Sequence, residues 1–265
     1  MNGNAKQLFS IHDSEKSNHM IVFALGMNYC LRDTVRSKNM YTDKYSLTRE
    51  QSVFLARKKW DENVFCGMKM ENRNVTFPQT QAILNGVNVP SVSLDDIVAI
   101  LNMRDAWRFL LETLDEPITV EYFCKLNSYV SRNESLQWGV LRTGTVGISG
   151  VKYVPPLPER KTIDQELRIV LDESCDDTEK SLDLFLWGAR RQIFWDGNKR
   201  SSLMLANKLM VERGRGIITI DDAAMAEFSS MLSLFYETGS SSELKKFLYD
   251  TSIKGIDYPK EKSKD

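Results

Sequence analysis

A run of five residues in the last third of the chain carries the groups that a phosphate and metal site needs. Asp196 offers the hard oxygen ligand that Mg²⁺ prefers, and Gly197 lets the backbone approach a ligand closely. Asn198, Lys199 and Arg200 follow directly, and a helix is expected to begin near Asn198. Free N–H groups at a helix start bind anions, and cations there oppose the helix dipole unless an anion lies above them. The run predicts phosphate binding, although a solvated Asp-Gly-Asn turn explains much of the same string.

Apolar stripes on both sides of this run predict two buried helices that hold it rigidly. Residues 178–193 and 198–213 both have apolar side chains spaced three or four positions apart. Gly214 and Gly216 end the second helix, as glycines commonly do at helix C-termini. The run is therefore expected to form a short loop between two packed helices.

Two further segments accompany the run in an order that resembles a known family. Gln192-Ile-Phe-Trp-Asp-Gly-Asn-Lys-Arg200 resembles the signature His-x-Phe-x-Asp/Glu-Gly-Asn-Gly/Lys-Arg of Fic (Fido-fold) proteins. Residues 139–156 are similar to the flap hairpin of that family. Met70-Glu-Asn-Arg-Asn-Val-Thr-Phe-Pro-Gln-Thr80 is similar to a segment that precedes many Fic cores. The resemblance covers about residues 60–250.

The resemblance implies an all-α, mainly helical protein with the Fic/Fido fold, a small β-hairpin flap and an N-terminal helical extension. We expect an N-terminal extension over 1–45 and a helical segment with the inhibitory motif over 46–90. The Fic core would cover 91–253, and a charged tail would cover 254–265.

Periodicity and turn signals predict the individual elements. A hairpin is expected over Thr143–Val151, because this stretch is rich in glycine and β-branched residues. Residues 217–220 are expected to be extended. Helices are expected over 20–35, 46–65, 93–111, 119–130, 163–172, 178–193, 198–213, 223–236 and 241–251.

Fic proteins typically transfer AMP from Mg·ATP to a serine, threonine or tyrosine hydroxyl of a target protein. In this sequence the resemblance places Asp196 on Mg²⁺ and makes Phe194 the anchor of the loop in the core. Glu71 would correspond to the inhibitory glutamate that obstructs the γ-phosphate site. The nucleotide phosphates would be cradled by Gly197, Asn198, Lys199 and Arg200.

The flap implies a protein partner. In the family it presents the target chain as an added strand, which is β-augmentation in physical terms. The residues that would dock the target are Thr145, Val146, Gly147 and Ile148.

Three departures from the family pattern bear on the reaction. Gln192 stands where the family has its histidine, and a carboxamide has no useful basicity near pH 7, so it cannot act as the general base. Leu203 stands where many members have a second arginine, which leaves Glu71 without its usual partner. Gly67 stands where the family has a serine or threonine, four residues before Glu71. Lys199, in place of the commoner glycine, resembles a branch whose members phosphorylate their target.

These departures leave three functions open. The chain could be a nucleotide-dependent transferase with weak or altered chemistry, in which Gln192 positions a nucleophile by hydrogen bonding. It could be a catalytically inactive module that binds nucleotide and protein. It could also be a hydrolase that removes AMP, with Glu71 aligning a water molecule.

Other residues near the loop have less specific interpretations. Trp187 and Trp195 could stack on a base, but core packing is favoured, because aromatic side chains carry much of the buried area. Arg190 and Arg191 could help to hold phosphate, but exposed helix positions are favoured. The two histidines, His12 and His19, lie outside the recognised core and are expected at the surface.

Composition limits the class of protein. The 265 residues carry a net charge of −1, which gives no broad electrostatic footprint for nucleic acid. Four separated cysteines without a Cys-x-x-Cys pair are expected to be reduced thiols in a cytoplasmic protein rather than a zinc site. No apolar run reaches the length of a membrane span, so membrane insertion is not expected. A homo-oligomer is possible.

Overall fold

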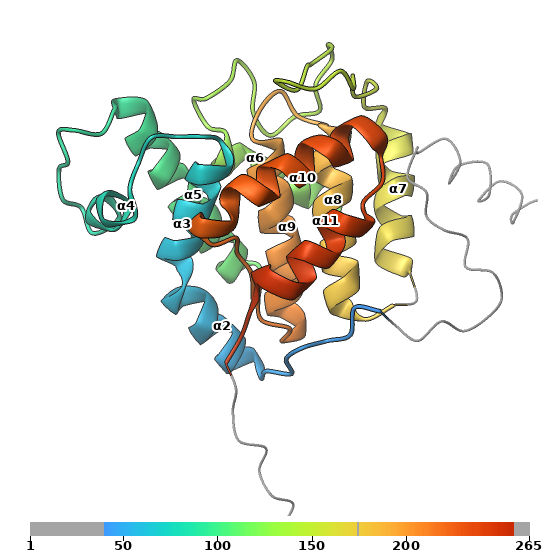
Figure 1. Cartoon of the computed structure of the whole chain (residues 1–265), viewed down its shortest axis with the longest axis horizontal. Helices are drawn as coiled ribbons and strands as arrows, with labels where there is room; N and C mark the ends of the chain where they lie inside the picture. Colours follow the sequence, from blue (N-terminus) through green and yellow to red (C-terminus); the bar gives the residue numbers. More distant parts are fainter. Residues whose placement is uncertain (1–39, 174, 257–265) are drawn as a thin grey trace, which may run out of the picture.

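The protein is built around a central pair of helices, α8 (Asp177–Arg191) and α9 (Asn198–Arg213), which lie side by side (Figure 1). The structure is a computed structural model that describes residues 40–173 and 175–256. The other helices are α2 (Arg49–Lys58), α3 (Trp60–Met70), α4 (Phe77–Leu84), α5 (Leu94–Glu112), α6 (Val120–Val130), α7 (Arg160–Asp172), α10 (Met225–Thr238) and α11 (Ser242–Phe247). A mainly helical fold is therefore confirmed.

Two short helical turns and one small sheet complete the described chain. A 3₁₀ turn covers Asp222–Ala224, and a π turn over Leu248–Ser252 follows α11 directly. Strand β1 (Ile217–Ile218) pairs antiparallel with β2 (Ile253–Lys254). The extended segment expected over 217–220 therefore begins with a strand. No helix in the described ranges is both long and apolar enough to cross a lipid bilayer.

Helix α9 is buried on all sides. Only Lys199, Glu212 and Arg213 among its 16 residues escape full burial. A helix that presents no outer face must be covered by neighbours, and α8, α6, α5 and α2 all pack against it. The first turn of α9 is consequently held in a fixed position. The sequence likewise predicts a rigidly held loop between α8 and α9.

Two apolar clusters pack against this central pair. The larger joins side chains from α3, α5 and α6 and has Trp107, Phe123 and Trp187 as its largest fully buried residues. The second lies between α9, the end of α8 and helices α10 and α11, with Phe185 and Phe228 in contact. In Figure 1, α10 and α11 lie across one face of the molecule.

Helices predicted over 93–111, 119–130, 163–172, 178–193, 198–213 and 223–236 are confirmed with small shifts at their ends. The cap signals explain several starts, because Ser93 and Thr119 accept backbone N–H groups of the first turn. The helix expected over 241–251 is divided into α11 and the π turn. The helix expected over 20–35 lies outside the described residues, as do His12 and His19.

The single helix predicted over 46–65 is wrong, because the structure has two helices there. Thr48 caps α2 in a capping box with Gln51, and α2 ends before Lys59. Lys59 has φ −107° and ψ 6°, and α3 begins at the next residue. One non-helical residue redirects the axis without erasing the apolar spacing, so periodicity alone does not reveal the break.

Helix α4 was not predicted, although its start carries a local signal. Thr76 and Gln79 form a reciprocal capping box, and Pro78 lies in the first turn. Proline is tolerated there because the N–H it lacks has no partner inside the helix. The capping box at Thr76 is the sequence signal that marks this helix start.

The β-hairpin predicted over Thr143–Val151 is wrong. The flap, residues 139–156, contains no strand, and its backbone makes a turn in which Val151 N–H donates to the Ile148 carbonyl. The carbonyls of Gly144, Pro155 and Pro156 instead accept hydrogen bonds from the Arg142 side chain. Those carbonyls are engaged, and the two prolines have no N–H to donate, so a paired ladder is not formed at this end of the flap.

Candidate functional site

The loop between α8 and α9 is closed by the side chain of its own asparagine. Asn198 Oδ1 accepts the Phe194 N–H at 2.9 Å, and Asn198 Nδ2 donates to the Phe194 carbonyl at 2.9 Å. Asn198 is only 5% exposed. The side chain that the sequence assigns to nucleotide binding is therefore committed to the shape of the loop.

Phe194 fixes the loop to the core, as its position in the motif predicts. Its ring is 1% exposed and lies edge-on to Phe123, with 4.9 Å between the ring centroids. One turn further along α6, Asn127 Nδ2 donates to the Asp196 carbonyl and to the Ser201 hydroxyl, both at 3.0 Å. An apolar contact and a buried amide, both from α6, thus hold the loop.

The start of α9 presents an anion-binding arrangement. Gly197 is the N-cap residue and has φ 71°, a left-handed conformation that glycine adopts without strain. A Cβ added there would lie 3.1 Å from Ser131 Cβ, so a side chain would also be crowded. The first backbone N–H groups of α9 have no carbonyl within the helix to bind, and the helix dipole adds positive potential. A phosphate would be stabilised at this helix end.

Asp196 lies at the edge of this helix end and is half-buried. Its Oδ1 atom accepts the Gly197 N–H at 2.6 Å. Burial raises the pKa of the Asp196 carboxyl, while the Gly197 hydrogen bond and Arg200 oppose that shift. Within the described ranges no three His, Cys, Asp or Glu side chains gather to hold a metal. One carboxylate suits Mg²⁺ only where phosphate oxygens and water supply the remaining ligands.

Glu71 and Lys199 meet directly in front of this helix end. Lys199 Nζ lies 3.1 Å from Glu71 Oε2 and donates to the Met70 carbonyl at 2.7 Å. Leu203, where the sequence lacks the expected arginine, is 2% exposed and packs in the same apolar cluster as Cys66 and Met70. The usual arginine partner of Glu71 is absent at position 203, and a lysine one turn earlier on α9 supplies a positive charge instead.

Arg200 is buried among carboxylates rather than open to a ligand. Its side chain is 1% exposed, with Nη1 2.9 Å from Glu134 Oε1 and Nε 3.4 Å from Glu71 Oε1. Burial alone would lower the pKa of Arg200, but Glu71 and Glu134 outweigh it and raise the pKa. Glu71 thus contacts both cations that the sequence assigns to phosphate.

Sequence reasoning missed Glu134 and Arg73. Glu134 is 7% exposed and accepts hydrogen bonds from both Arg200 and Arg73. Arg73 Nη1 in turn lies 2.9 Å from Asp96 Oδ1 at the start of α5. These charges come from distant parts of the chain, and no motif spacing connects them, so the sequence carries no signal for this network.

Gln192 ends α8 in a left-handed conformation, with φ 47° and ψ 53°. Its Nε2 atom donates to the Ala189 carbonyl at 2.7 Å, and its own carbonyl accepts from Arg142 Nε at 2.6 Å. The side chain of residue 192 is therefore folded back on α8 as a capping amide. In this arrangement it offers no basic nitrogen to a substrate.

A buried tyrosine hydroxyl lies beside Gln192. Tyr236 of α10 is 3% exposed, and its hydroxyl has no hydrogen-bond partner of good geometry among the described residues. Burial raises the pKa of Tyr236, the charge on Glu71 adds to the rise, and the nearby Gln192 side chain opposes it. The hydroxyl therefore stays protonated at neutral pH, as a donor rather than a base.

The flap lies against the motif loop. A Cβ added at Gly144 would lie 2.7 Å from the Trp195 ring, so the flap backbone packs directly on this indole. Beyond Gly144 the exposure of the side chains alternates, with Thr145 and Gly147 exposed and Val146 and Ile148 half-buried. Such alternation is typical of an extended segment although no strand is paired here.

The arginines and tryptophans beside the loop are only partly as predicted. The exposed positions favoured for Arg190 and Arg191 are wrong, because the Arg190 side chain packs 3.9 Å from the centre of the Tyr153 ring. Arg191 lies 2.8 Å from the buried Glu166, which also accepts the Trp187 Nε1–H at 2.9 Å. Trp187 is a core residue, as favoured.

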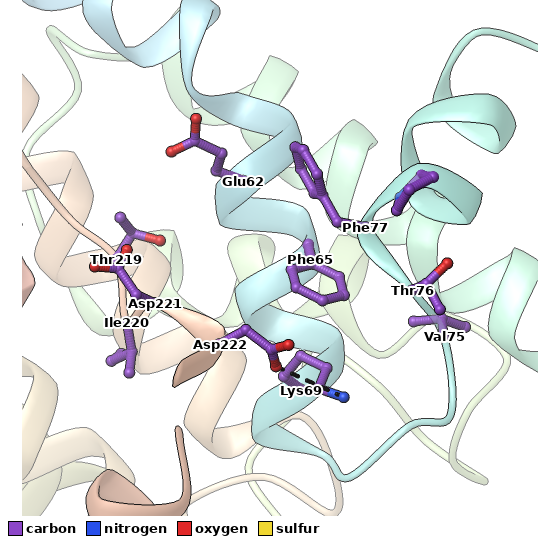
Figure 2. A pocket seen from close by; sticks show the side chains of 11 residues that line it. Glu62, Phe65, Lys69, Val75, Thr76, Phe77, Thr219, Ile220, Asp221 and Asp222 are labelled. Carbon is purple, nitrogen blue, oxygen red and sulfur yellow. Dashed lines mark ion pairs between the residues drawn. The ribbon is translucent and has the colours of Figure 1, made fainter. Parts of the chain in front are cut away.

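A separate pocket of about 520 Å³ lies between α3, residues 75–78 and the segment from Thr219 to Asp222. Figure 2 shows Phe65, Val75 and Phe77 on one side of it, and the segment from Thr219 to Asp222 on the other. Lys69 crosses its edge, 3.7 Å from Asp222. None of the motif residues from Gln192 to Arg200 lines this pocket.

Comparison with known sequences gives distant relatives. No protein-family model matches the chain. Proteins named protein adenylyltransferase Fic, from Drosophila persimilis and Drosophila pseudoobscura pseudoobscura, are each 23% identical to it over 235 residues. The match covers 84% of this chain and 46% of each relative. The chain thus spans about half the length of the curated relatives it matches.

Comparison with solved structures identifies the architecture. Fic-1 (residues 134–508) from C. elegans matches with a TM-score of 0.61 at 20% identity, over 91% of this chain and 69% of that one. Its E274G form matches with a TM-score of 0.64 at 19% identity, over 92% and 70%. A Fic family protein from Desulfovibrio desulfuricans G20 gives 0.62 at 14% identity, over 73% and 62%. With its central helix pair and the loop between them, the chain has the Fic fold.

Proposed function

We propose that this chain is a nucleotide-binding protein of the adenylyltransferase (AMPylating) family that acts on a protein hydroxyl, with weak or altered transfer. The observation that carries the proposal is the preformed loop at the start of α9. Two hydrogen bonds between Asn198 and Phe194 fix its shape, and Gly197 opens the helix end to an anion. The adenylyltransferase names of the Drosophila relatives support the same activity class.

ATP with Mg²⁺ is the ligand that these residues fit. Asp196 supplies one half-buried carboxylate, and the first turn of α9 supplies N–H groups for phosphate oxygens. Lys199 is one-quarter exposed and remains accessible to a phosphate that displaces Glu71. Arg200, which Glu134 holds in the protein interior, would add positive charge beneath the phosphate site.

Glu71 is proposed to obstruct this site. Its carboxylate already contacts Lys199 and Arg200, which are the cations that a triphosphate would need. A nucleotide must therefore move Glu71 or share these cations with it. The hydrolytic alternative, in which Glu71 aligns water, receives no support from these contacts, because both carboxylate oxygens face cations.

A catalytically inactive nucleotide- and protein-binding module is the second candidate. The observation that favours it is the contact between Gln192 Nε2 and the Ala189 carbonyl. This hydrogen bond gives the amide a structural role at the end of α8, and an amide cannot remove a proton from a target hydroxyl. Both candidates share the nucleotide site and differ only in whether transfer occurs.

Calorimetric titration with Mg·ATP tests the shared part. We expect heat and thermal stabilisation at millimolar ATP, both reduced in Asp196→Ala. Absence of both effects in the wild type and in Glu71→Gly would overturn nucleotide binding, because the obstruction is removed in that variant.

Transfer of label from α-labelled ATP to proteins of a cell lysate separates the two candidates. We expect little transfer by the wild type and a gain by Gln192→His, with a further gain when Glu71→Gly is added. Robust labelling by the wild type that Asp196→Ala abolishes would show that Gln192 supports catalysis. No labelling by the double variant despite ATP binding would favour the inactive module.

A further inference from the structure

A buried arginine without an acidic partner lies between the flap and the motif loop. Arg142 is 1% exposed, and no carboxylate within residues 40–173 and 175–256 forms an ion pair with it. Its guanidinium donates instead to four main-chain carbonyls. The distances are 2.6 Å to Gln192, 2.6 Å to Gly144, 3.1 Å to Pro155 and 2.7 Å to Pro156.

This arrangement is costly unless every contact is made. A buried charge without a counter-ion must be compensated by hydrogen bonds and local dipoles. The four carbonyls and the negative end of the α8 dipole provide that compensation here. Burial still lowers the pKa of Arg142, and Arg191 lowers it further. The cost of burying Arg142 must therefore be offset by the segments that its hydrogen bonds hold together.

The four acceptors belong to three separate segments. Gly144 lies on the first leg of the flap, and Pro155 and Pro156 lie on the second. Gln192 is the motif residue at the end of α8. The backbone N–H of Arg142 also donates to the Ile193 carbonyl at 3.0 Å. One side chain thus closes the flap into a loop whose ends are adjacent, which is the geometry of an Ω-loop, and ties that loop to residue 192.

We propose that Arg142 is the positioning residue that sets the flap relative to the side chain of residue 192. The inference rests on the proposed function, in which the chain acts on a protein hydroxyl; the flap is the segment expected to dock that protein, and residue 192 occupies the position of the motif histidine. A non-glycine residue in the left-handed region is strained, and the contact from Arg142 Nε helps to hold Gln192 there. One guanidinium therefore holds both the flap and residue 192, the two parts of the site that must meet a target chain.

Other contacts to the flap are weaker or exposed and cannot replace this one. Glu237 of α10 is exposed and accepts the Lys152 N–H. Tyr153 stacks on Arg190, which donates only long hydrogen bonds, of 3.3 Å, to the carbonyls of Phe235 and Tyr236. These contacts fix one leg of the flap, whereas Arg142 contacts both.

Hydrogen exchange of the full chain tests the inference without any nucleotide or target. Arg142→Met keeps the volume and removes all donors, and Arg142→Lys keeps the charge and some donors. We expect amide exchange across 144–156 to accelerate at least tenfold in Arg142→Met and by less in Arg142→Lys. Exchange in the middle of α8 and α9 should change much less.

Lys208→Met is the matched control. Lys208 is also fully buried and donates to the main-chain carbonyls of Leu114 and Glu116, far from the flap in sequence, and to Glu212. This variant should lose stability without selective acceleration of the flap. The indole N–H resonance of Trp195, against which Gly144 packs, should shift in both Arg142 variants and stay in place in Lys208→Met.

The outcomes separate this inference from the proposed function. Unchanged exchange in the flap of a folded Arg142→Met would overturn the positioning role, whatever the protein does with ATP. If Arg142→Met does not fold, Arg142→Lys is the deciding variant. Flap exchange rates and a Trp195 resonance identical to those of the wild type in Arg142→Lys would overturn the positioning role equally. If the protein does not bind ATP but the Arg142 variants show the expected exchange pattern, the proposed function is overturned and the coupling between flap and residue 192 stands.

Discussion

Lys199 and Glu71 form an ion pair across the space between α3 and α9, with 3.1 Å between Lys199 Nζ and Glu71 Oε2. The same ammonium donates to the Met70 carbonyl, which lies at the C-terminal end of α3. A cation at that end is favourable for the α3 dipole. One lysine thus stabilises α3 and neutralises Glu71, and a phosphate would compete with Glu71 for it.

Removing the charge of Glu71 is expected to strengthen nucleotide binding. In Glu71→Gln the shape is kept, but the carboxylate that occupies Lys199 and Arg200 is lost. We expect the Kd for Mg·ATP, measured by calorimetry, to fall at least tenfold, which corresponds to about 1.4 kcal/mol. Glu62→Gln, which changes a half-buried carboxylate on α3 that pairs with Lys59, should leave the Kd unchanged. Equal affinities in wild type and Glu71→Gln would show that Glu71 does not obstruct the site.

Loss of the Asn198 amide is expected to loosen the loop and destabilise the fold. Asn198→Ala removes two buried hydrogen bonds and leaves the Phe194 N–H and carbonyl without partners. We expect the free energy of unfolding to drop by about 2–3 kcal/mol. Denaturant unfolding followed by circular dichroism measures it. The exposed Asn85→Ala should change it by less than about 0.5 kcal/mol, and a similarly small loss in Asn198→Ala would contradict the structural role.

Breaking the buried ion pair below the loop is expected to have a larger effect. Glu134→Gln leaves Arg200, which is 1% exposed, with a weakened partner and also removes the ion pair with Arg73. We expect a loss of about 3 kcal/mol in unfolding free energy, because removing one partner strands a buried charge. Asp115→Asn, which breaks an exposed pair with Arg49, should cost under about 1 kcal/mol. Comparable losses in the two variants would mean that Arg200 is not held by Glu134.

The sequence predicted those parts of the fold that depend on local spacing. The apolar stripes that define α8 and α9 and the helix start at Asn198 depend on neighbours within one or two turns. The break at Lys59 was missed, because a single residue with altered torsion angles leaves the apolar spacing intact.

The parts of the site that were missed or wrong depend on contacts between distant segments. The flap has a hairpin composition, but Arg142 draws its carbonyls toward Gln192, 50 positions further along the chain. Glu134 reaches Arg200 across 66 positions. The pairing of Glu71 with Lys199, in place of an arginine at position 203, could have been inferred from the sequence. Residues 199 and 203 are four positions apart and share one face of α9.

A buried carboxylate on α8 predicts a measurable pH dependence of stability. Asp183 lies 2.7 Å from Lys245 Nζ, which also contacts Glu179 at 2.9 Å and lies over the Tyr41 ring. Burial raises the pKa of Asp183 to about 6, and the attraction of Lys245 only partly opposes this. The folded protein therefore keeps a proton between about pH 4 and pH 6 that the unfolded chain has released.

The contribution of Asp183 to stability is consequently greatest at low pH and is lost as the pH rises through about 6. Asp183→Asn removes this dependence, so the stability difference between variant and wild type should shift in favour of the variant between pH 4 and pH 7. The shift should be at most about 3 kcal/mol. Urea unfolding at a series of pH values measures it, with the exposed Glu243→Gln on α11 as a control that should track the wild type. A pH-independent difference for Asp183→Asn would show that Asp183 titrates at the same pH in both states.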